Sequence, residues 1–128
     1  MEDEKTPYEV IGEAEGVERL VHRFYDLMDE LPEAQEIREM HAKSLKSSRE
    51  KLILFLTGWL GGPQLYVEKY GHPRLRARHM PFDIGEDERQ QWMLCMRQAL
   101  EDEVESDELR RFLDTALDRV AAHMRNQP

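Results

Sequence analysis

The sequence has very little cysteine: Cys95 is the only one among 128 residues. A single thiol cannot form an internal disulfide, and the closely spaced ligand pairs of zinc and iron–sulfur sites, such as CxxC, HxxxH and HExxH, are absent. There is also no Walker loop, GxGxxG string or GxSxG string, which removes the common nucleotide-binding and acyl-transfer classes. We expect Cys95 to be a small buried hydrophobic residue in a protein of the cytoplasm.

Long apolar runs and an excess of positive charge are missing as well. The longest apolar run, Leu52 to Leu60, is far too short to cross a bilayer, and the start at Met1 lacks the basic-then-apolar order of a secretory signal. The 18 basic and 27 acidic side chains leave a formal net charge of −9. Such a field does not attract nucleic-acid phosphates or anionic lipid. We expect a soluble, unprocessed protein that binds neither nucleic acid nor membrane.

Helical periodicity is what the sequence does contain. Apolar residues recur every three or four positions, and no segment alternates apolar and polar residues over the length of a strand, so we predict an all-α fold. The length suits about one domain, which we assign to residues 1–128, with a disordered tail over residues 1–5. A chain this short buries only about two-thirds of its unfolded surface. A cofactor held in the core would therefore add to the buried surface.

The first half of the chain carries clear helix boundaries. The string Thr6-Pro7-Tyr8-Glu9 is a capping box that begins a short helix ending near Gly12. An amphipathic helix with apolar residues from Val17 to Leu31 follows, and a shorter one covers about 33–40. The segment 52–60 is apolar nearly all round, so we expect it to be buried on several sides.

The second half is predicted with one irregular interruption. Gly61-Gly62-Pro63 ends the apolar helix, and a short helix through Tyr66 and Tyr70 follows. We expect residues 71–85 to be a long irregular connection. Gly85 and Glu88 begin the next helix, and one more helix ends the chain. The inner face of the helix that begins at Gly85 is predicted to consist of Trp92, Met93, Met96, Ala99 and Leu100. The inner face of the last helix is predicted to consist of Leu109, Phe112, Leu113, Ala116, Leu117, Val120, Ala121 and Met124.

Several strings together resemble the group II truncated haemoglobins. They are Phe24-Tyr25, the run FLTGWLGGP at 55–63 with Tyr66, the run YGHPRLRARHMPF at 70–82, and Trp92. They occur in the family's order over roughly residues 6–125. The resemblance implies a truncated globin fold, a two-over-two helical sandwich around one haem b.

The same resemblance implies roles for individual residues. His79 would be the iron ligand, and a histidine ring nitrogen suits that position when its second nitrogen has an acceptor. Tyr25 and Trp92 would donate hydrogen bonds to the bound ligand, and His41 would join them on the distal side. Without the family pattern, a lone histidine in a loop would be read as structural or solvated, and the two aromatics as core packing.

The resemblance also implies a set of haem contacts. Arg78 and Lys51 match cationic positions that face the haem propionates, although both are also compatible with solvated charges. Arg74 and Arg76 are expected on the surface. The other expected contacts are Ser48, Leu52, Phe55, Tyr66, Met80, Phe82 and Met96.

Three functions are compatible with this pattern. The first is a globin that binds oxygen and other diatomic ligands, for storage or for redox chemistry on oxygen, nitric oxide or peroxide; peroxidase-like and dioxygenase-like activities stay open. Sustained dioxygenase activity would need an external reductase, because the chain has no flavin or nicotinamide motif. The second is a haem-based gas sensor or ligand-dependent interaction module. The third, a helical bundle without cofactor, leaves the 71–79 string unexplained. We expect a monomer or a weak homodimer.

Overall fold

The computed structural model describes residues 5–127, which form helices joined by turns and loops. The expected tail over residues 1–5 falls outside the described residues except for Lys5. The helices are α1 (Pro7–Ile11), α2 (Glu13–Glu30), the 3-10 turn η1 (Pro32–Ala34), α3 (Gln35–Glu39), α4 (Lys46–Trp59), α5 (Leu65–Tyr70), α6 (Leu75–His79), α7 (Glu86–Glu103) and α8 (Asp107–His123).

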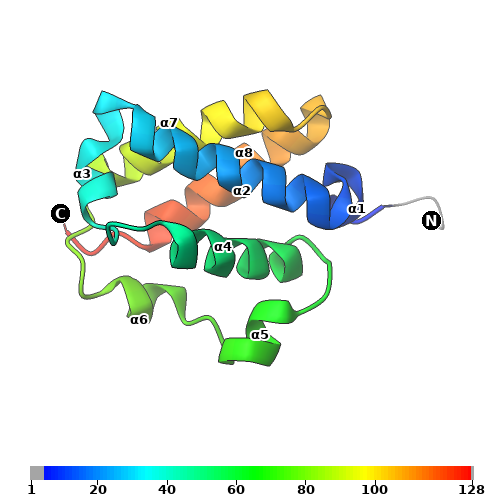
Figure 1. Cartoon of the computed structure of the whole chain (residues 1–128), viewed down its shortest axis with the longest axis horizontal. Coiled ribbons are helices and arrows are strands. Elements are labelled where there is room, and N and C mark those ends of the chain that lie inside the picture. The colour runs from blue at the N-terminus through cyan, green and yellow to red at the C-terminus, as the bar shows by residue number, and fades with distance from the viewer. Residues whose placement is uncertain (1–4, 128) are drawn as a thin grey trace.

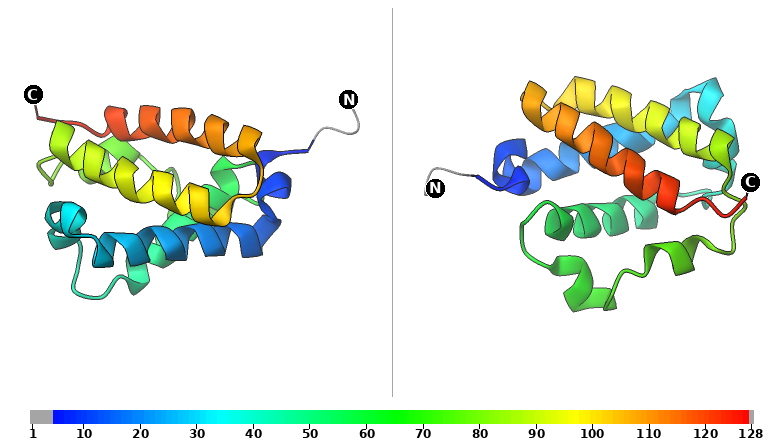
Figure 2. Two further views of the ribbon diagram at one scale, coloured as in Figure 1. Left: turned by 90° about the horizontal axis from the view of Figure 1, so that it is seen from above. Right: turned by 180° about the vertical axis from the view of Figure 1, so that it is seen from behind.

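Two pairs of long helices form the body of the molecule. Helix α2 packs against both α4 and α7, and α7 packs against α8. The partners in each pair run antiparallel, with α4 returning beside α2 and α8 returning beside α7 (Figures 1 and 2). The predicted all-α class and two-over-two arrangement are confirmed. No helix among the described residues is long and apolar enough to cross a membrane.

The core lies where α2 meets the other three long helices. Its most deeply buried side chains include Val17, Leu20, Val21, Phe24, Met28, Leu56, Met93, Cys95, Met96 and Leu113. Cys95 has no exposed surface, and burial raises the pKa of its thiol to about 11. The prediction that Cys95 is a buried hydrophobic residue is therefore confirmed.

Local capping sets several helix ends where the sequence places them. The Thr6 hydroxyl accepts the Glu9 backbone N–H at 3.1 Å, while the Glu9 carboxylate accepts the Thr6 N–H at 3.1 Å. At the start of α7, the Glu88 carboxylate accepts the Gly85 N–H at 2.7 Å. These bonds satisfy backbone donors that a helix leaves without an internal partner. The boundaries predicted at Thr6 and Gly85 are confirmed.

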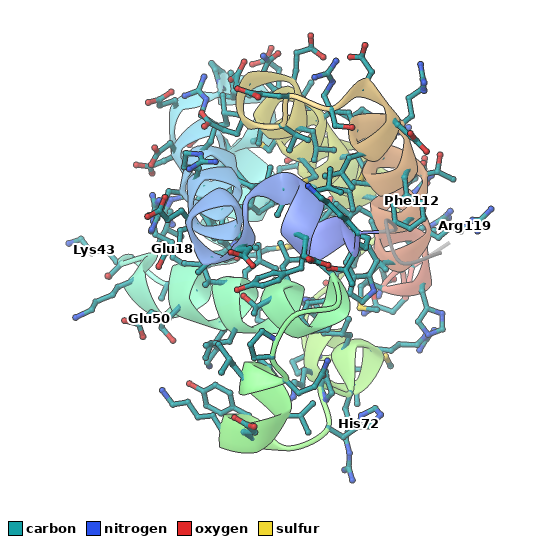
Figure 3. The ribbon with its side chains drawn as sticks, turned by 90° about the vertical axis from the view of Figure 1, so that its right-hand side faces the viewer. Glu18, Lys43, Glu50, His72, Phe112 and Arg119 are labelled. Atoms are coloured by element: carbon teal, nitrogen blue, oxygen red, sulfur yellow. The ribbon has the colours of Figure 1, made fainter. Side chains whose placement is uncertain are left out.

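Three expectations are wrong in part. Residues 71–85 are not all irregular, because α6 forms within them between Pro73 and Pro81. The face of α4 is less buried than expected: within 52–60 only Leu56, Thr57 and Leu60 are fully buried. Phe112 does not join the inner stripe of α8. It is 54% exposed and projects outward near Arg119 (Figure 3), because the buried stripe follows a strict four-residue spacing from Leu109.

The junction of α1 and α2 depends on a glycine inside a helix. Gly12 (φ 106) turns the chain back sharply, which brings the Ile11 carbonyl against Gly16. A Cβ at position 16 would lie 1.9 Å from that carbonyl oxygen and 2.6 Å from its carbon. Both atoms belong to backbone, so a side chain at position 16 requires the two helices to separate.

Gly16→Ala is therefore expected to destabilise the protein by about 1–3 kcal/mol, the usual cost of overpacking, despite the higher helix propensity of alanine. Chemical denaturation followed by circular dichroism measures the loss. Glu15→Ala, at the exposed neighbouring position, is the control and should change stability by no more than about 0.5 kcal/mol. Equal stabilities for the two variants would contradict the close approach at Gly16.

Candidate functional site

The predicted site residues come from separate segments of the chain. Tyr25 lies on α2, His41 follows α3, Trp92 lies on α7, and His79 is the last residue of α6. Helix α6 runs along α4 on the side away from α2 (Figure 1). No residue of α6 is fully buried. The face of α4 that carries Leu52 and Phe55 is only half-buried. The region bounded by α4 and α6 is therefore the candidate site.

His79 has one ring nitrogen fixed by the backbone. Its Nδ1 lies 2.6 Å from the carbonyl oxygen of Leu75, one helical turn earlier. A carbonyl can only accept, so Nδ1 carries the proton and Nε2 keeps its lone pair. The side chain is half-buried. This is the tautomer in which a histidine binds a metal through Nε2.

A row of aromatic rings leads across the site from α7. The Phe24 ring meets Trp92 edge-on at a centroid distance of 5.0 Å and Tyr25 at 4.9 Å. The Tyr25 ring meets the His41 ring at 5.9 Å, also edge-on. Phe24 is fully buried at the centre of the row, while Trp92 and His41 are half-buried. The structure thus brings together the three residues predicted for the distal side.

Tyr25 is buried, and its phenol hydroxyl forms no hydrogen bond with any residue that the structure describes. Its side chain is 6% exposed. Burial raises the pKa of the phenol, and the nearby positive charge of Arg49 opposes that rise. The hydroxyl therefore stays protonated at neutral pH. It can donate a hydrogen bond to a small ligand.

His41 is held in the neutral state. Its Nδ1 lies 2.7 Å from the carbonyl oxygen of Ile37. Burial lowers the pKa of His41, and the charges of Arg38 and His79 lower it further, whereas the bond to Ile37 acts in the opposite direction. Because Nδ1 donates to the carbonyl, Nε2 of His41 is left as an acceptor.

Two cations meet two tyrosines between α4, α5 and α6. The Lys51 ammonium lies 5.8 Å from the centroid of the Tyr70 ring, and the Arg78 guanidinium lies 5.9 Å from that of Tyr66. The Arg78 Nε also donates to the Pro73 carbonyl at 2.7 Å. Both cations are exposed. They can face an anionic group at the outer edge of the site.

The remaining predicted residues differ widely in exposure. Ser48, Leu52 and Phe55 are half-buried on α4, and Tyr66 is 7% exposed. Met80 and Phe82 are 53% and 42% exposed, just after α6. Met96 has no exposed surface and lies in the core with Met93. Arg74 and Arg76 are exposed, as expected.

Sequence reasoning missed two side chains beside the site. Arg49 lies over the Tyr25 ring, with its guanidinium carbon 5.8 Å from the centroid. Asn126 fastens the loop after His79: its amide nitrogen donates to the Phe82 carbonyl at 2.7 Å, and its amide oxygen accepts the Ile84 N–H at 2.9 Å. Arg49 follows no pattern that separates it from other polar residues of α4. Asn126 is 42 positions from Ile84, beyond the reach of a local motif.

Comparison with known proteins gives one consistent result. The family model described as bacterial-like globin matches residues 6–126. The group 2 truncated hemoglobin YjbI of Bacillus subtilis is 40% identical over 121 residues, which cover 94% of this chain and 89% of that protein. The solved group II 2-on-2 hemoglobin of Agrobacterium tumefaciens is 46% identical with a TM-score of 0.96, and the match covers 98% of each chain. The cold-adapted truncated hemoglobin of the Antarctic bacterium Pseudoalteromonas haloplanktis is also 46% identical, with a TM-score of 0.95 over 97% of this chain and 100% of that one.

Proposed function

This chain belongs to the bacterial-like globin family as a group II truncated haemoglobin, and we propose that it holds haem b between α4 and α6 and retains oxygen beside Tyr25 and Trp92. Binding of haem and of oxygen follows from the family. The roles of individual residues are part of this proposal. The observation that carries it is the His79 ring, whose Nδ1 is bound to the Leu75 carbonyl while Nε2 keeps its lone pair.

The residues present fit such a cofactor. A haem needs one strong axial ligand, an apolar surface for the macrocycle and cations for its two propionates. His79 supplies the ligand atom, and the half-buried Leu52 and Phe55 supply apolar surface on α4. Lys51 and Arg78 supply exposed positive charge near the same helices. Haem b, when bound, provides an iron centre for oxygen and other diatomic ligands.

On the proximal side, the protein controls the orientation and basicity of one ring. The Leu75 carbonyl accepts the Nδ1 proton of His79 and so directs the Nε2 lone pair away from the helix backbone. The same bond raises the basicity of Nε2, because the acceptor stabilises positive charge on the ring. His79 therefore acts as an oriented, electron-rich ligand.

On the distal side, two donors face the ligand. Among the described residues no hydrogen bond to the Tyr25 hydroxyl or to the Trp92 indole N–H is found, so both donors are available to a polarised diatomic ligand. Neutral His41, with its free Nε2, adds an acceptor beside Tyr25. Two donors slow ligand release. This arrangement suits storage, or redox chemistry fed by an external reductase, better than rapid transport.

A haem titration tests the proposed function. We expect one haem per chain, a Soret band in the ferric and dithionite-reduced protein, and a stable spectrum of the oxygenated form. Absorption at each addition of haem gives the stoichiometry. A folded chain that takes up no haem stoichiometrically would overturn the proposal and favour an interaction module without cofactor.

A further inference from the structure

Arg49 bridges α2 and α4 at one place. Its Nη2 donates to the Asp26 carboxylate at 2.8 Å, and its Nη1 donates to the His22 carbonyl at 3.1 Å. The same Nη1 lies 3.1 Å from the His22 Nδ1. The Arg49 side chain is 22% exposed and the Asp26 side chain 49%. The guanidinium is therefore held in one position by partners on the neighbouring helix.

That position is over the ring of Tyr25. The guanidinium carbon lies 5.8 Å from the ring centroid, within the range of a cation–π contact. Phe24 and His41 contact the same ring edge-on. Arg49 is thus one of three side chains that define where the phenol lies. It is the one that carries a positive charge.

The charge also affects the strength of the phenol as a donor. Burial disfavours ionisation of Tyr25, and Arg49 acts in the opposite direction. A phenol that ionises more easily donates a stronger hydrogen bond to an acceptor with partial negative charge. Because the Asp26 side chain is half exposed, water solvates much of its negative charge. Asp26 therefore cancels only part of the positive charge that Arg49 presents to Tyr25.

On these contacts, and resting on the proposed function, we infer that Arg49 is a positioning residue of the distal site, which fixes the Tyr25 ring and strengthens its donor for oxygen. Oxygen takes up negative charge when it binds and accepts a hydrogen bond, whereas carbon monoxide remains nearly apolar. Arg49 therefore favours oxygen over carbon monoxide. Its contribution acts only through the Tyr25 hydroxyl.

The test is a double-mutant cycle in the haem-loaded protein. Arg49→Met keeps an unbranched apolar stem and removes the guanidinium with its charge. We expect oxygen release to become about 2- to 10-fold faster, in keeping with a partly buried cation–π contact, while release of carbon monoxide changes less than twofold. In a Tyr25→Phe background the same substitution should leave oxygen release unchanged. Stopped-flow measurement gives all the rates, and Arg49→Lys, which restores the charge, should recover part of the loss.

Arg89→Met is the matched control. Arg89 is 24% exposed and pairs with Asp118 at 2.6 Å across α7 and α8, so its loss removes a similar ion pair between two helices that do not carry Tyr25. It should lower stability without changing oxygen release. The C–O stretching frequency of the carbon monoxide form should shift in Arg49→Met and stay constant in Arg89→Met, because it reports the electrostatic field at the ligand.

Two outcomes overturn the role of Arg49 while leaving the proposed function in place. One is an unchanged oxygen release rate in haem-loaded Arg49→Met. The other is an equal acceleration with and without the Tyr25 hydroxyl, which would indicate a general loosening of α2 and α4. A wild-type chain that binds no haem would instead refute the proposed function and the role of Arg49 together.

Discussion

Replacing His79 by alanine is expected to weaken haem binding by more than about 100-fold. Loss of a partner that merely orients a metal-bound histidine commonly costs 10- to 100-fold in affinity, and His79→Ala removes the ligand itself. Transfer of haem to an apoglobin acceptor, followed in the Soret region, measures the loss.

The His79 variant has both a control and a rescue. His123→Ala removes an exposed histidine from α8 and should leave haem affinity within twofold of the wild type. Adding free imidazole to His79→Ala should restore the spectrum of a histidine-ligated haem, since a soluble ring can enter the position that the side chain has left. Unchanged haem retention in His79→Ala would show that another residue is the ligand.

Tyr25→Phe is expected to speed oxygen release by about 10- to 100-fold. A hydrogen bond to a partly charged acceptor is worth roughly 1.5–3 kcal/mol, and each 1.4 kcal/mol changes a rate about tenfold when it acts on the bound state alone. The substitution removes one oxygen atom and keeps the ring contacts with Phe24 and His41. Stopped-flow displacement of oxygen by carbon monoxide gives the rate.

Tyr8→Phe provides the comparison for Tyr25→Phe. Tyr8 is a half-buried tyrosine on α1, outside the row of rings that leads to Tyr25. Removal of the Tyr8 hydroxyl should leave the rate of oxygen release unchanged. If Tyr25→Phe released oxygen at the wild-type rate as well, the donor at the ligand would have to be Trp92 or another group.

Sequence patterns located most helices because their ends are set locally. The capping box at Thr6 and the Gly85–Glu88 pair each act over three residues, so the signal and the structure lie together in the chain. The short helix α6 was not predicted, because its five residues, which lie between Pro73 and Pro81, are too few to show a helical periodicity. The residue that precedes it, Arg74, adopts the left-handed conformation at φ 46.

Burial was harder to predict than helix position. The apolar pattern of α4 suggested burial on several sides, yet Leu52 and Phe55 are only half-buried. Apolar character alone does not say whether a face meets protein or a bound group. The family resemblance predicts haem as the partner of this face. Phe112 was misplaced for a related reason, since an apolar residue at the margin of a helical stripe can face solvent.

The family strings predict residues that could contact the cofactor or ligand. They do not predict the side chains that pack against those residues. Arg49 contacts Tyr25 from α4, and its partners His22 and Asp26 lie 27 and 23 positions earlier. Such contacts depend on how α2 and α4 cross. No short motif describes them, so they were visible only in the folded chain.

The bonds from Asn126 set an order of events during synthesis. Its amide also lies 3.4 Å from the His79 carbonyl, a residue made 47 positions earlier. At about 5–20 residues per second on the ribosome, that separation corresponds to about 2–9 s. During that interval α7 and α8 are still being made, and the loop after His79 lacks its final fastening. If haem enters next to α6, as we propose, a haem that arrives in those seconds meets α6 before Asn126 has fastened the loop after it, and one that arrives later meets that loop in its final position.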